Sequence, residues 1–161
     1  MKKLMLMLLA TVLLLSGCGG EKQEAAASLT CKLSISCANL INNAALDEAK
    51  RSLVPEDGWL LEPTDCAFAD GESVFDVLNR AVRENKIHME FVETPAYNSV
   101  YIEGIGNLYE FDGGPQSGWM YSVNGEFPNY GCSGVKLKHG DVVEWVYTCD
   151  LGNDVGRSMA Q

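Results

Sequence analysis

Between residues 89 and 148 the sequence is divided into short apolar segments separated by glycine, asparagine and proline, which is the pattern of a chain rich in β-strands. Asn124-Gly125 is the dipeptide that two-residue hairpin turns prefer, because both positions tolerate a positive φ. The second half of the chain is therefore expected to form β-sheet. The segments expected as strands are 89–92, 100–105, 108–111, 119–123, 135–137 and 142–148.

The first half of the chain contains two further strand patterns and a short helical one. Residues 30–37 alternate between apolar and polar side chains, which predicts a strand with one buried face. A second short strand is expected at 65–69. Between them, the apolar residues of 39–53 recur at helical spacing, which predicts a short helix.

The clearest helix signal begins at Ser73. Ser73 precedes Asp76 by three residues, in a pattern similar to a capping box, and an amphipathic segment follows. We expect the main helix over about 73–86. With the shorter helical segment and the strand-rich C-terminal half, the sequence predicts a compact α+β domain.

The N-terminus has the features of an export signal. Two lysines precede an apolar run over 4–15, which is too short to span a bilayer as a stable anchor, so 1–17 is interpreted as a signal peptide. The sequence LSGC ending at Cys18 resembles the lipobox of bacterial lipoproteins, and this implies that the thiol of Cys18 carries the lipid. The alternative is a free secreted protein with an incidental cysteine.

The resemblance to lipoproteins sets the expected domain organisation. Residues 18–29 are expected to form a lipidated, flexible tether, residues 30–152 the folded domain and residues 153–161 a frayed tail. The domain would then work near the outer face of the cell membrane. The whole chain has 12 Lys and Arg against 22 Asp and Glu, for a net charge of −10, which excludes nucleic acid as an expected partner.

Exported proteins can contain disulfides, and five cysteines follow Cys18. If 136–138 and 142–148 form a hairpin, Cys132 lies opposite Cys149, and we expect a disulfide between them. Cys37 and Cys66 are a weaker alternative pair, which would leave Cys31 without a disulfide partner. The cysteines and histidines lack the close spacing of a zinc site, so no metal is expected.

Aromatic residues give the strongest indication of a binding surface. Eleven of the fourteen lie between residues 91 and 147, where tyrosine and tryptophan offer flat apolar faces with a polar group. The alternative is that they fill a small β-rich core. The candidate ligand-binding residues are Tyr130, Phe127, Trp119, Tyr121, Asp112 and Ser117.

Catalysis has little support in the sequence. His88 begins an expected strand and His139 occupies an expected turn, and neither belongs to a motif that would position a catalytic base. The chain is therefore expected to be a non-enzymatic module, with no catalytic residues.

Two motifs indicate a family. The segment GWMYSVNG at 118–125 and the segment GDVVEW at 140–145 resemble the transcobalamin-C-terminal-like family, DUF4430, and 71–78 resembles the start of its main helix. The similarity extends from about residue 30 to about residue 152. It implies a β-grasp-like domain of the kind that closes over cobalamin in carrier proteins, where a separate helical barrel forms the other side of the site.

The resemblance leads to two functional hypotheses. The first is a lipid-anchored extracytoplasmic binding module that takes up a corrinoid such as cobalamin. A chain of 161 residues has no room for the helical barrel, so a surface or transporter protein would complete the site. The second hypothesis is a surface module for protein–protein or polymer interaction or adhesion, without a small-molecule ligand. A concave, aromatic pocket near Tyr130 and residues 112–118 would favour the first.

Overall fold

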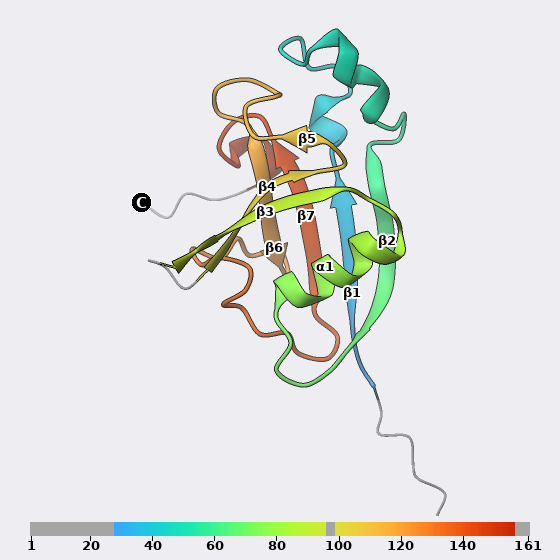
Figure 1. The fold of residues 1–161 in the computed structure, drawn as a ribbon, viewed down its shortest axis with the longest axis vertical. Coiled ribbons are helices and arrows are strands. Elements are labelled where there is room, and N and C mark those ends of the chain that lie inside the picture. The colour runs from blue at the N-terminus through green and yellow to red at the C-terminus, as the bar shows by residue number, and fades with distance from the viewer. Residues whose placement is uncertain (1–27, 96–98, 157–161) are drawn as a thin grey trace, which may run out of the picture.

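The computed structural model describes residues 28–95 and 99–156. A four-stranded sheet in the order β2-β1-β7-β6 forms the centre of the domain (Figure 1). Its central pair is parallel, β1 with β7, while β2 and β6 are antiparallel to their neighbours. The strands are β1 (Leu29–Ser36), β2 (Trp59–Phe68), β6 (Gly118–Val123) and β7 (Val142–Thr148).

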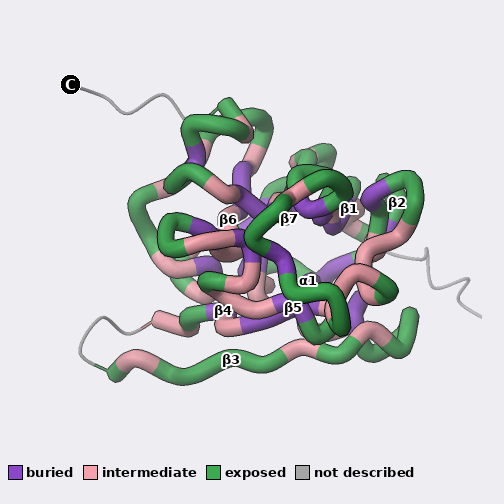
Figure 2. The backbone as a smooth tube through the Cα atoms, turned by 90° about the horizontal axis from the view of Figure 1, so that it is seen from above, coloured by how far each residue is buried: buried purple, intermediate pink, exposed green. Residues whose placement is uncertain are grey.

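A helix and a smaller sheet cover one side of this central sheet (Figures 1 and 2). The smaller sheet has the order β3-β4-β5, with antiparallel pairing throughout. The domain has the α+β architecture that the sequence predicts. These covering elements are α1 (Val74–Glu84), β3 (Met89–Thr94), β4 (Ser99–Ile105) and β5 (Leu108–Tyr109).

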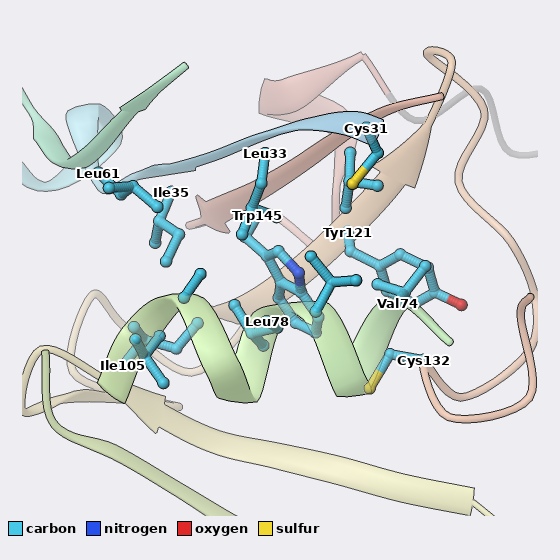
Figure 3. Close-up of a cluster of buried hydrophobic side chains, with 14 of the residues drawn as sticks. Cys31, Leu33, Ile35, Leu61, Val74, Leu78, Ile105, Tyr121, Cys132 and Trp145 are labelled. Atoms are coloured by element: carbon cyan, nitrogen blue, oxygen red, sulfur yellow. The ribbon is translucent and has the colours of Figure 1, made fainter. Parts of the chain in front are cut away.

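The main core lies between the central sheet and α1. Figure 3 shows Leu33 and Trp145 extending from β1 and β7 toward Val74 and Leu78 of the helix. A second, smaller core is centred on Tyr147, at the other end of β7; it also contains Cys37, Leu40, Leu46 and Leu108.

The predicted capping box at the start of α1 is confirmed. The backbone N–H of Asp76 donates to the hydroxyl of Ser73, and the carboxylate of Asp76 accepts from the backbone N–H of Ser73 at 2.7 Å. Two of the unpaired N–H groups at the helix start are thereby satisfied. Hydrogen bonds from Ser73 lower the pKa of Asp76 below its ordinary value.

The lowered pKa makes the capping box sensitive to acid. The carboxylate stabilises the folded state above the unfolded-state pKa of about 4 and ceases to do so as the pH falls through the lower folded-state pKa. We expect Asp76→Asn to lower the free energy of unfolding at pH 7 by under about 1 kcal/mol, since the carboxylate is exposed and screened. Urea unfolding at pH 7 and about pH 2 should show this difference disappearing in acid. Asp70→Asn, in the preceding exposed turn, is the control; an acid-independent difference for Asp76→Asn would contradict the mechanism.

The short helix expected over 39–53 is replaced by two 3₁₀ turns, Ala38–Leu40 and Glu48–Leu53. Between them the side chain of Asn43 accepts from the backbone N–H of Ala45 at 2.7 Å. Such a local bond competes with the backbone pairing of an α-helix, which explains why the helical spacing does not produce one.

The strand expected at 135–137 is also absent from the described structure, apart from an isolated bridge between Ser73 and Lys136. This segment instead runs beside the start of α1. The backbone N–H of Val74 donates to the carbonyl of Val135, and the N–H of Leu137 donates to the carbonyl of Glu72. The predicted hairpin between 136–138 and 142–148 is therefore wrong, because β7 already pairs on both sides with β1 and β6.

The chain ends differ partly from expectation. Residues Asn153–Val155 form a 3₁₀ turn, and the carboxylate of Asp154 accepts from the hydroxyl of Thr148 and the backbone N–H of Cys149. This part of the expected frayed tail is thus ordered. The expected signal peptide, Cys18 and most of the tether lie outside the described residues, as do 157–161. Over the described ranges, no helix has the length and apolar character to cross a membrane.

Candidate functional site

A cleft of about 860 Å³ opens between β4, β6 and the loop 128–134. Three separate elements of the fold therefore meet around one space. Aromatic and small side chains dominate the cleft, and it lies within the size range of small-molecule sites. Its lining residues are Thr94, Ser99, Val100, Tyr101, Ile102, Trp119, Met120, Tyr121, Pro128, Asn129, Tyr130, Gly131, Cys132, Gly134 and Trp145.

Two stacked aromatic rings form the buried part of the cleft. The rings of Tyr121 and Trp145 lie 5.2 Å apart with an angle of 27° between their planes. Alternation along the antiparallel strands places both side chains on the face that also packs against α1 (Figure 3). Among the described residues, the indole N–H of Trp145 is buried without a hydrogen-bond partner. In the described structure, the floor of the cleft formed by these two rings therefore contains one N–H group that donates no hydrogen bond.

Hydrogen bonds hold the loop 128–134 against the two strands. The hydroxyl of Tyr121 donates to the carbonyl of Tyr130 at 2.7 Å, and the backbone N–H of Val100 donates to the hydroxyl of Ser133 at 3.1 Å. A Cβ on Gly131 would lie 1.4 Å from the hydroxyl oxygen of Ser99. The loop can approach β4 this closely because residue 131 has no side chain.

The described lining residues carry no formal charge, although the whole chain has a net charge of −10. Burial and the nearby carboxylate of Glu110 raise the pKa of Tyr101 to about 12. Burial also raises the pKa of Tyr121. Both hydroxyl groups therefore stay protonated at neutral pH and serve as hydrogen-bond donors. The cleft is suited to a flat, largely apolar ligand with polar groups at its edge.

Three of the predicted ligand-binding residues, Trp119, Tyr121 and Tyr130, meet in this cleft. Tyr130 leaves 74% of its surface exposed, so its ring is available at the rim. Tyr121 is a floor residue, and it combines the core role and the site role that the sequence analysis treated as alternatives. Phe127, which directly precedes this loop, is half-buried and does not line the cleft.

Asp112 and Ser117 do not line the cleft and instead stabilise the loop between β5 and β6. Asp112 pairs with Lys50 at 2.6 Å and accepts from the backbone N–H of Tyr109 at 2.7 Å. Ser117 is buried and lies 3.0 Å, oxygen to oxygen, from the hydroxyl of Tyr147. Both side chains thus bond to the protein itself, and Ser117 contacts Tyr147 of the second core.

Strand β4 contributes one wall of the cleft, and none of the predicted site residues lies on it. Val100 and Ile102 of β4 pair with Glu93 and Phe91 of β3 and also line the cleft, where β4 contacts β6. The concentration of aromatic residues was a usable signal for Tyr101, which is 46% exposed. The sequence contains no local pattern that indicates which strands from different sheets will face each other.

The expected disulfide between Cys132 and Cys149 is wrong, because both thiols are free and lie in different cores. The thiol of Cys132 contacts the carbonyl of Val100, whereas Cys149 contacts Asn43. This error follows from the hairpin that does not form. Burial raises the pKa of Cys132 to about 12. No cluster of three or more candidate metal ligands occurs within 28–95 or 99–156.

The alternative pair, Cys37 with Cys66, does not form either. Cys37 belongs to the second core, while Cys66 packs against the main one. The first two strands are antiparallel, as that pairing required, but the observed register places Cys31 opposite Cys66. The sequence pattern established the strands without establishing their register.

Comparisons with known proteins agree with this fold. Residues 71–149 match the model of the family described as "Domain of unknown function (DUF4430)". The structure is similar to haptocorrin in complex with Cbi, with a TM-score of 0.57 and 15% sequence identity. This match covers 78% of the present chain but only 26% of the haptocorrin chain. The present chain thus corresponds to about a quarter of that protein.

A second solved structure gives a weaker match. It is described as a putative metal binding protein from Ruminococcus gnavus ATCC 29149, and it has a TM-score of 0.44 with 16% identity. The match covers 74% of the present chain and 96% of the other. No curated protein matches the chain significantly.

Proposed function

Since the chain belongs to the DUF4430 family through residues 71–149, we propose that its domain is a ligand-binding module whose site is the aromatic cleft. The observation that carries this proposal is the uncharged, aromatic lining of the cleft in a chain of net charge −10. An acidic protein that leaves one concave surface free of charge favours a flat ligand with extensive apolar faces. A corrinoid, which is a planar macrocycle with polar substituents at its edge, is the sharpest candidate.

The similarity to haptocorrin, whose solved complex contains Cbi, supports a corrinoid over other flat ligands. The match covers 26% of the haptocorrin chain, so most of that protein has no counterpart here. The cleft therefore contacts one side of the ligand in this proposal. A surface or transporter protein, or a second copy of this chain, covers the other side.

The proposed location is the outer face of the cell membrane, with the lipid attached to Cys18. Two acyl chains on one cysteine would provide stable anchoring, which a single chain does not. Replacing Cys18 with alanine should move the protein from the membrane fraction to the soluble fraction. Unchanged partitioning would reject the lipid anchor without affecting the cleft.

Ligand binding is tested by thermal unfolding of the full chain in detergent, with and without cobalamin and its corrinoid precursors. A ligand at 100 times its dissociation constant should add about 2.7 kcal/mol to the free energy of unfolding. Equilibrium dialysis with the same corrinoids measures binding directly. Failure of every corrinoid in both measurements would reject a site that binds corrinoids without a partner.

Tyr130 provides the sharpest test of the cleft, because its exposed ring lies at the rim. We expect Tyr130→Ala to weaken corrinoid binding by about tenfold through loss of ring contact, with little effect on folding. Phe111→Ala is the matched control, since Phe111 is 62% exposed and does not line the cleft. Equal affinities for the two variants in equilibrium dialysis would contradict the assignment of the site.

One observation favours the second hypothesis, an interaction module without a small ligand. Strand β3 lies at the edge of the small sheet and is largely exposed (Figure 2). Phe91 and Val92 on this strand are 38% and 39% exposed. An exposed strand edge can pair with an extended segment of another protein. Substitution of Val92 by lysine would weaken such a partner's binding and leave corrinoid binding unchanged.

A further inference from the structure

Two free thiols face each other across the first strand pair. Cys31 of β1 is the direct partner of Cys66 in the antiparallel register with β2. Residues directly opposite in such a pair have Cα atoms about 4.5 or 5.5 Å apart, and both spacings lie inside the range of about 4.4–6.8 Å that a disulfide accepts. Directly opposite side chains also extend to the same face of the sheet.

The neighbouring pair establishes this register independently. Lys32 follows Cys31 and Asp65 precedes Cys66, and these two residues pair across the strands with an ion pair of 2.9 Å. Because side chains alternate along a strand, this exposed ion pair implies that Cys31 and Cys66 lie together on the opposite face, toward α1. Figure 3 shows the sulfur of Cys31 on the helix side of β1. Cys31 belongs to the main core, and Cys66 packs against it.

One of the two thiols is accessible. Cys31 is 2% exposed, whereas Cys66 is only half-buried and lines a cavity of about 320 Å³ with Arg80 and Glu84. The thiol of Cys66 presently donates to the carbonyl of Thr64 at 3.8 Å, which is a weak contact. Because side chains can move between staggered χ1 positions, this weak contact does not fix the Cys66 sulfur in place.

We propose that Cys31 and Cys66 are an oxidisable pair that forms a cross-strand disulfide by exchange with a low-molecular-weight disulfide. The thiolate of Cys66 attacks one sulfur of the oxidant, which breaks the oxidant's S–S bond and releases one thiolate. The thiolate of Cys31 then attacks the sulfur of Cys66, forming the Cys31–Cys66 bond and releasing the second thiolate. The two protons from the cysteines are taken up by the two released thiolates, so the protein is oxidised as the added disulfide is reduced to two thiols.

The bond would connect edge strand β2 to central strand β1 and close a loop that contains the 3₁₀ turns Ala38–Leu40 and Glu48–Leu53. Closing a loop of this length restricts the unfolded chain. We therefore expect oxidation to raise the thermal unfolding midpoint by about 10 °C.

Peptide mapping tests the proposal directly, because trypsin places each of the five cysteines in a separate peptide. The full chain is incubated with oxidised glutathione at mildly alkaline pH, blocked with an alkylating reagent and digested without reduction. The expected product is a disulfide between peptides 23–32 and 52–80, with the loss of two free thiols. Reduction with dithiothreitol should restore both thiols and the lower unfolding midpoint.

Two variants provide the controls. Cys66→Ala, at a half-buried position, should fold and should lose both the linked peptide and the stabilisation by oxidant. Cys149→Ala, at a half-buried position in the other core, should behave like the unsubstituted chain. Glutathione that remains attached to Cys66, a bond between other peptides, or an unchanged thiol count would each overturn the proposal. None of these outcomes bears on the aromatic cleft.

Discussion

Replacing Gly131 with alanine is expected to destabilise the fold by about 3 kcal/mol and to abolish ligand binding in the cleft. The added Cβ would lie 1.4 Å from the hydroxyl oxygen of Ser99 and 2.7 Å from its Cβ. Rotation of the serine hydroxyl relieves the first contact but not the second, so the loop must move away from β4. Urea unfolding and equilibrium dialysis with a corrinoid measure the two effects.

Two further variants separate this clash from a general effect of losing a glycine. Gly134→Ala changes the same loop, but its nearest contact would be 3.4 Å from the carbonyl oxygen of Gly131, so a loss under about 1 kcal/mol is expected. Combining Gly131→Ala with Ser99→Gly removes both clashing serine atoms and should recover most of the lost stability. A double variant as unstable as Gly131→Ala alone would contradict the proposed cause.

Replacing Tyr147 with phenylalanine should lower the free energy of unfolding by about 2–3 kcal/mol, because a buried hydroxyl with several partners is lost. This hydroxyl donates to the carbonyl of Tyr109 at 2.6 Å and accepts from the backbone N–H of Gly113 at 3.1 Å. The side chain is 1% exposed, so water does not replace the hydroxyl and the carbonyl of Tyr109 loses this donor. Chemical denaturation of the variant measures the loss.

Tyr130→Phe is the matched control for this substitution. It removes the same atom from a tyrosine that is 74% exposed, and a change within about 0.5 kcal/mol is expected. The loop between β5 and β6 should also become more accessible to proteases in Tyr147→Phe. A stability equal to that of the unsubstituted chain would show that the Tyr147 hydroxyl does not secure this loop.

Local patterns were sufficient to predict most of the elements. The alternation at 30–37 and the serine–aspartate pair before α1 correspond to β1 and to the capping box. Asn124 and Gly125 both adopt positive φ, as the expected turn requires. These features depend only on residues that are close together in the sequence, so the sequence alone is sufficient to predict them.

The errors concern partners that are distant in sequence. The apolar character of 135–137 was interpreted as a strand, whereas this segment accepts and donates hydrogen bonds at the start of α1. The incorrect hairpin then produced the incorrect disulfide of Cys132 with Cys149. Strand register and pairing depend on the whole fold, and spacing within one segment does not determine them.

The candidate site was only partly predicted, because the partners of several of its residues are also distant in sequence. Tyr121 and Tyr130 were selected for their aromatic rings and lie in the cleft. Asp112 and Ser117 were selected as members of a loop, but Lys50 and Tyr147 engage them from distant parts of the chain. In the sequence, a polar side chain that bonds within the protein looks the same as one that binds a ligand. Only the structure shows which partner it has.

The parallel pairing of β1 with β7 determines when this protein can fold. Thr30 and His139, at the start of this pair, are 109 residues apart in sequence and in hydrogen-bond contact. Contacts of such long range form slowly, because a large loop must close before they stabilise the chain. A nascent chain emerges with its N-terminus first, so the central strand pair cannot form until residues 142–148 have emerged. The domain therefore completes its folding only after nearly its entire length has been released.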